Sequence, residues 1–107
     1  MLDYTITRTD NPTSAEELRE ILANPGFGKH FTDHMVTIDW TEEKGWHDAK
    51  VRPYGPMTME PASNVFHYGQ AIFEGIKAYR QPDGSIATFR PDHNAQRFIN
   101  SAERLAM

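Results

Sequence analysis

Arg97 is the side chain of this 107-residue sequence best suited to bind an anion. The sequence predicts a helix that begins at Pro91, with Arg97 in one row with Asn94, Ser101 and Arg104 along the border of an apolar stripe. The planar guanidinium group carries a fork of N–H donors that matches the oxygens of a phosphate group. An arginine in this row can reach across a groove or remain solvated, and the helix pattern alone leaves both open.

A second set of candidate residues lies in the segment from residue 67 to residue 79. Tyr68 and Phe73 could wall an apolar pocket or simply pack in a core, since aromatic side chains bury large areas in either case. Gly75 sits within a strand pattern, where glycine often marks a close approach of a ligand or a backbone, or a bulge. Glu74 and Lys77 could join a polar network or face water.

Other common kinds of chemistry find little support in the sequence. The five histidines show no metal-ligand spacing with acidic neighbours, so no metal site is expected. The chain contains no Gly-x-Gly-x-x-Gly fingerprint and no P-loop. It has no cysteine, which excludes a disulfide framework and a thiolate metal site.

Periodicity and turn residues predict the elements that position these side chains. Residues 4–8 alternate as a short strand, and Ser14 with Glu17 forms a capping-box pattern for a helix ending at Ala23. Two further strands are expected at residues 35–40 and 49–53, joined by a turn, with an ordered loop over residues 53–62. Residues 75–80 and 85–89 flank a Gln-Pro-Asp-Gly turn and predict an antiparallel hairpin. The last helix runs from Pro91 to the end and directs Ala95, Phe98 and Ile99 toward a core.

Composition narrows the class of protein. The length predicts one domain, and the elements predict an α+β fold with an antiparallel sheet and flanking helices. The net charge of −4 lacks the basic excess of a nucleic-acid-binding surface. No apolar run is long enough for a membrane span, and the N-terminus lacks the order of a secretion signal, so a cytoplasmic location is expected. The mean hydropathy of −0.66 is polar for so small a core. Either a missing partner domain covers apolar surface, or a flexible N-terminal tail dilutes the average.

Several motifs in one order resemble the N-terminal part of branched-chain amino-acid aminotransferases. The motifs are Gly-Phe-Gly-Lys from residue 26, Phe-Thr-Asp-His-Met from residue 31, the His-Tyr-Gly-Gln-Ala-Ile-Phe-Glu-Gly-Ile-Lys-Ala-Tyr run over residues 67–79, Phe-Arg-Pro from residue 89, and Gln-Arg-Phe from residue 96. The resemblance covers residues 26–107, read as a small α+β domain. Residues 1–25 are read as a variable N-terminal extension.

The resemblance implies a pyridoxal 5'-phosphate (PLP) enzyme of fold type IV, with the D-amino-acid-aminotransferase-like fold. Such an enzyme moves an amino group from leucine, isoleucine or valine to 2-oxoglutarate, giving glutamate, and works as a homodimer. In this family Arg97 would hold the PLP phosphate. Substrate contacts are implied for Tyr68, Phe73, Phe27, Gly75 and Lys77. No catalytic residue is expected in this chain, because none of its four lysines matches the family's Schiff-base lysine, which is expected beyond residue 107.

Two alternatives remain open. A D-amino-acid aminotransferase or an aminodeoxychorismate lyase would keep the fold and change the substrate, although the Phe-Glu-Gly motif at residue 73 and the early Phe-Gly-Lys segment weigh against both. A non-catalytic fragment or dimerisation module is the alternative of a different class. For the 107 residues alone, the expectation is that they catalyse nothing.

Overall fold

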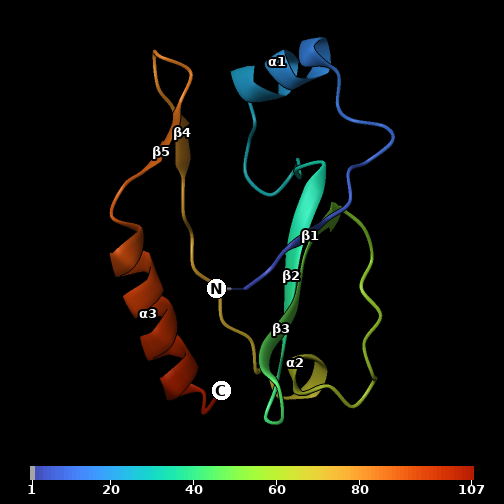
Figure 1. The fold of residues 1–107 in the computed structure, drawn as a ribbon, viewed down its shortest axis with the longest axis vertical. Helices are drawn as coiled ribbons and strands as arrows, with labels where there is room; N and C mark the ends of the chain where they lie inside the picture. The colour runs from blue at the N-terminus through green and yellow to red at the C-terminus, as the bar shows by residue number, and fades with distance from the viewer. Residues whose placement is uncertain (1) are drawn as a thin grey trace. The chain divides into compact units, whose positions relative to one another are not determined.

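The computed structural model describes residues 2–107 as two units, which meet in sequence between residues 57 and 58. The first unit contains β1 (Thr5–Ile6), α1 (Ala15–Ala23), β2 (His34–Thr41) and β3 (Gly45–Pro53) (Figure 1). The second contains α2 (Asn64–His67), β4 (Ala78–Arg80), β5 (Ile86–Thr88) and α3 (Pro91–Arg104). The predicted α+β class is confirmed. The single-domain expectation with a boundary at residue 26 stays a prediction.

The first unit is a three-stranded sheet with the order β1-β3-β2. β2 and β3 form an antiparallel hairpin, whereas β1 pairs in parallel with β3, so the predicted purely antiparallel sheet is wrong for this unit. β1 comes from the predicted extension and contributes Thr5 opposite Lys50 and Ile6 opposite Val51. Residues 7–33, which include α1, reverse the direction of the chain between β1 and β2. Because β2 is in turn antiparallel to β3, β1 runs parallel to β3.

α1 begins and ends where the sequence predicts. Ser14 is its N-cap, and the Ser14 hydroxyl accepts a hydrogen bond from the Glu17 backbone N–H at 3.2 Å. Asn24 ends the helix, and its backbone N–H donates to the Ile21 carbonyl. The predicted capping residue therefore satisfies one of the backbone donors that every helix leaves open at its start.

The second unit carries the predicted hairpin and the predicted long helix. β4 and β5 pair antiparallel, and Gly84 adopts the positive φ of +84° that the turn requires. Pro91 occupies the first turn of α3, where its missing N–H costs no helical hydrogen bond. The strands are shorter than predicted, and Gly75 precedes β4 instead of lying inside a strand. The short helix α2 has no counterpart among the predicted elements.

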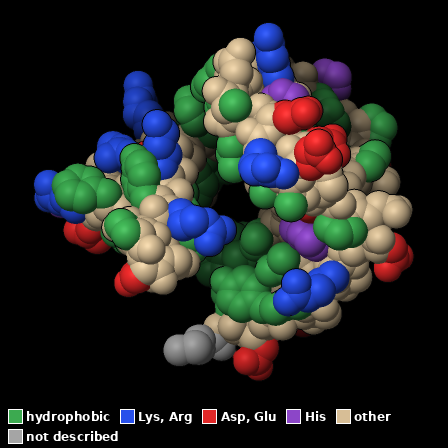
Figure 2. Space-filling view, turned by 90° about the horizontal axis from the view of Figure 1, so that it is seen from above, with side chains coloured by type: hydrophobic (Ala, Val, Ile, Leu, Met, Phe, Trp, Pro, Cys, Tyr) green, Lys and Arg blue, Asp and Glu red, His purple; other side chains and the backbone are tan. Residues whose placement is uncertain are grey.

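Burial is where the sequence expectations fail. Ala49 is the one buried hydrophobic residue among those the structure describes. The stripe of α3 predicted to face a core is exposed, with Phe98 and Ile99 both more than 40% accessible. In β2, Val36 and Trp40 are likewise exposed, because nothing in the described residues covers them. Figure 2 shows hydrophobic side chains lying open between charged ones.

The accessible surface gives the size of this uncovered area. The chain exposes 9834 Å². Two separate compact units of half its 12.3 kDa mass would together expose about 7,300 Å². The excess of roughly 2,500 Å² is comparable to the area that a large, permanent protein–protein interface removes from water. Separately, none of the helices in residues 2–107 has the length and apolar character needed to cross a membrane.

Candidate functional site

The candidate site lies in the second unit, where residues 70–75 run antiparallel alongside α3 (Figure 1). Polar side chains hold this segment at both ends. At one end, the Gln70 side-chain amide donates to the Leu105 carbonyl at 3.2 Å. At the other, the Asn94 side-chain amide donates to the Gly75 carbonyl at 2.6 Å. The backbone of residues 71–73 is therefore set beside the second half of α3 without forming a strand.

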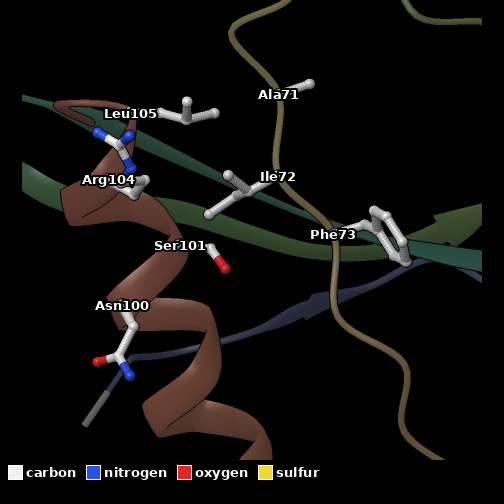
Figure 3. Close-up of a pocket in the computed structure, with 7 residues that line it drawn as sticks. All are labelled: Ala71, Ile72, Phe73, Asn100, Ser101, Arg104 and Leu105. Carbon is white, nitrogen blue, oxygen red and sulfur yellow. The ribbon is translucent and has the colours of Figure 1, made fainter.

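An open groove of about 570 Å³ lies between the Gln70–Leu105 and Asn94–Gly75 hydrogen bonds. Its apolar side comes from the 71–73 segment and the end of α3, and its polar side from the helix. The lining residues are Ala71, Ile72, Phe73, Asn100, Ser101, Arg104 and Leu105. Figure 3 shows the Ile72 side chain pointing toward α3 and the Phe73 ring pointing away from the helix. A groove with one apolar and one polar wall suits a small molecule that carries both kinds of group.

Arg97 and Glu74 form the main charged contact at the Asn94 end. Arg97 Nε donates to one oxygen of Glu74 at 3.0 Å, and Arg97 Nη2 donates to the other. The same carboxylate accepts a hydrogen bond from the Asn94 side chain and one from the Gly75 backbone N–H, each at 3.1 Å. Glu74 therefore accepts four hydrogen bonds, and its side chain is only 20% exposed.

This pairing fixes the charge state of both groups. The hydrogen bonds from Arg97 hold the pKa of Glu74 below its ordinary value of 4.5, and Asn94 adds to this against the opposing effect of partial burial. The hydrogen bonds to Glu74 raise the pKa of Arg97 above its ordinary value. A guanidinium group has five N–H donors, and Glu74 takes two of them, so three have no partner among residues 2–107. The Arg97 side chain is 58% exposed, so these donors can reach an anion.

The other predicted contact residues are placed less closely together. Tyr68 ends α2 and is 81% exposed. Lys77 is exposed just before β4. A Cβ added at Gly75 would have no atom within 4 Å. No close approach of the described residues therefore requires a glycine at this position. Phe27, which is almost fully exposed, belongs to the first unit.

Sequence reasoning missed two groupings. The first is the role of Glu74 as the partner of both Arg97 and Asn94. The helix row had placed Asn94 and Arg97 together, but nothing in that row pointed to Glu74. The second joins Asp39, His47 and Asp48 in the β2–β3 hairpin, where one ligand atom from each lies within 4.8 Å of the others. Asp39 and His47 are cross-strand partners, which corrects the expectation that no histidine has acidic neighbours at ligand spacing. The two carboxylates are exposed, as such groups commonly are without any ion.

Arg97 on α3, together with a neighbouring groove that has one apolar and one polar wall, thus fits a small-molecule site in an α+β protein. Comparison with curated proteins sharpens this class. A probable branched-chain-amino-acid aminotransferase of Streptomyces coelicolor is 62% identical over 97 residues, which is 91% of this chain and 27% of that protein. The branched-chain-amino-acid aminotransferase of Mycolicibacterium smegmatis is 56% identical over 106 residues, 99% of this chain and 29% of that protein.

A third relative, the branched-chain-amino-acid transaminase 1 of Bacillus subtilis, is 54% identical over 82 residues, 77% of this chain and 23% of that protein. No family model matches the chain. These branched-chain-amino-acid aminotransferases match 77–99% of this chain, and the chain spans about a quarter of the length of the curated relatives it matches.

Proposed function

We propose that this chain is the N-terminal part of a PLP-dependent branched-chain amino-acid aminotransferase of fold type IV. The term "full-length protein" here means a protein of the relatives' length that carries this chain. It would transfer the amino group of leucine, isoleucine or valine to 2-oxoglutarate, in the cytoplasm. Bound PLP would supply the electron sink that such chemistry needs.

The observation that carries the proposal is the free edge of Arg97. Its three remaining N–H donors have no partner among residues 2–107, its side chain is 58% exposed, and a charged planar donor fork fits the oxygens of a phosphate ester. We assign Arg97 to the PLP phosphate. The residues present therefore fit this part of the cofactor, and the high identity to named aminotransferases supports the choice of PLP over other phosphate esters.

The remaining predicted residues would serve the substrate. Tyr68, Phe73 and Phe27 would wall the pocket for the branched side chain, and Gly75 and Lys77 would line its approach. Their exposure in this chain is consistent with that role, because a pocket completed by other parts of the full-length protein leaves its first wall open. None of the lysines in this chain is assigned to catalysis.

The same uncovered surface favours assembly. The excess accessible area matches what further domains and a second subunit would cover, so we propose a homodimer whose sites lie near the subunit interface. For the 107 residues alone, the expected activity is none.

Arg97→Ala in the full-length protein tests the assignment. Affinity for PLP and for pyridoxal, which lacks the phosphate, is measured with the cofactor-free protein. Loss of a charge-assisted phosphate contact should weaken PLP by about ten- to a hundredfold and leave pyridoxal unchanged. Arg80→Ala removes another exposed arginine of the same unit and serves as the control. An unchanged ratio of PLP to pyridoxal affinity in Arg97→Ala would contradict the proposal.

A further inference from the structure

The Glu74 carboxylate occupies the Nε–Nη2 edge of Arg97, and no other side chain within residues 2–107 bonds to the guanidinium group. Both oxygens of the carboxylate are used, one by Nε and one by Nη2. A two-point contact of this kind fixes the plane of the guanidinium group, whereas a single contact would allow it to rotate. The direction in which the three free donors point is therefore set by Glu74.

Glu74 is itself held by contacts that do not involve Arg97. The Asn94 side chain donates both to the carboxylate and to the Gly75 carbonyl, and the Gly75 backbone N–H donates to the carboxylate as well. Asn94 lies one turn before Arg97 on α3, so the helix carries both the arginine and the group that locks its partner. The carboxylate is thus fixed relative to the helix on which Arg97 lies.

We propose that Glu74 is a positioning residue that orients Arg97 for a phosphate ester, with Asn94 holding Glu74 in place. This role rests on the proposed binding of the PLP phosphate by Arg97. A free arginine side chain has large rotamer freedom, which binding would have to remove. In this site the ion pair has removed it in advance, so a ligand would find the donors already arranged.

The opposing effect of Glu74 is electrostatic. A carboxylate next to Arg97 offsets part of the positive charge that attracts a phosphate dianion, so removing it could strengthen binding. The two effects have opposite signs, and they can be separated by experiment. If orientation dominates, Glu74→Gln weakens phosphate-ester binding; if charge dominates, it strengthens it.

The experiment is a double-mutant cycle in the full-length protein, with affinities for PLP and pyridoxal as the readout. We expect Glu74→Gln to weaken PLP by about five- to tenfold, from the restored rotamer freedom of Arg97, and to leave pyridoxal unchanged. In an Arg97→Ala background the same substitution should have no effect on PLP. Glu74→Asp, which keeps the charge but withdraws the carboxylate by one methylene, should weaken PLP in the same direction. Glu103→Gln, an exposed change on α3, is the matched control.

The outcomes distinguish this role from the alternatives. A gain in PLP affinity in Glu74→Gln would overturn it, because Glu74 would then compete with the phosphate for Arg97. An equal loss for PLP and pyridoxal, or a loss that persists in the Arg97→Ala background, would assign Glu74 to the general structure of the site. If Arg97→Ala lowers the PLP-to-pyridoxal ratio and Glu74→Gln does not, the positioning role alone is wrong. If Arg97→Ala leaves that ratio unchanged, the phosphate assignment is wrong and the positioning role falls with it.

Discussion

Phe73→Ala should change substrate selectivity in the full-length protein while leaving the stability of the isolated chain nearly unchanged. Phe73 is 92% exposed, although it lines the groove beside α3. Of the roughly 200 Å² of an aromatic side chain, only ~15 Å² is withdrawn from water. At ~25 cal/mol/Å² this burial is worth about 0.4 kcal/mol, against about 3–5 kcal/mol for a buried phenylalanine.

The small structural contribution makes the functional effect easier to measure. If Phe73 walls the side-chain pocket, its loss should lower kcat/KM for leucine by about ten- to two-hundredfold and leave glutamate comparatively unaffected. The assay compares kcat/KM for leucine and for glutamate as amino donors, in wild type and mutant both saturated with PLP. Phe89→Ala, which removes another exposed phenylalanine of the same unit, is the control. An unchanged leucine-to-glutamate ratio, or a parallel loss of both activities, would refute the pocket role of Phe73.

Two further predictions concern the local structure of each unit. The Thr13 hydroxyl and backbone N–H donate to Asp33 at 2.5 and 3.1 Å and lower the pKa of Asp33 below 3.8. A lowered carboxyl pKa contributes stability that is present above pH ~4 and is lost as the pH falls through that pKa. Thr13→Val should therefore move the Asp33 pKa back toward 3.8 in an NMR titration, and an unchanged pKa would remove Thr13 as the cause. Gly84 has a φ of +84°, and a Cβ added there would have no atom within 4 Å. Gly84→Ala should therefore lower the free energy of unfolding by about 1–2 kcal/mol through backbone strain alone. Amide hydrogen exchange in β4 and β5 should accelerate, and unchanged protection would contradict the strain.

The local elements could be predicted because their signals lie within a few residues. Ser14 caps α1 three residues before Glu17, and Gly84 closes a turn that residues 81–84 specify by themselves. Such contacts need no information from elsewhere in the chain. Parallel pairing of β1 and the shortness of β4 depend on tertiary geometry, and the sequence pattern does not contain it.

Burial and side-chain pairing were the parts that sequence patterns could not supply. The apolar stripe of α3 predicts a buried face, but burial requires a covering partner, which the described residues do not provide. Arg97 could be identified as an anion-binding candidate from its helix row, whereas its partner Glu74 lies 23 residues away with no periodic relation. The Asp39–His47 contact likewise follows from hairpin register, which a bulge between Thr37 and Asp39 shifts.

Amino-donor preference is the strongest test of the proposal that this chain is part of a branched-chain aminotransferase. Glutamate formation from 2-oxoglutarate is measured for the full-length protein with PLP, using leucine, isoleucine, valine and D-alanine as donors. We expect rapid PLP-dependent turnover with the three branched amino acids, little with D-alanine, and none above the free-PLP background for the 107 residues alone. Preference for D-alanine, or no glutamate from any of the branched donors, would contradict it.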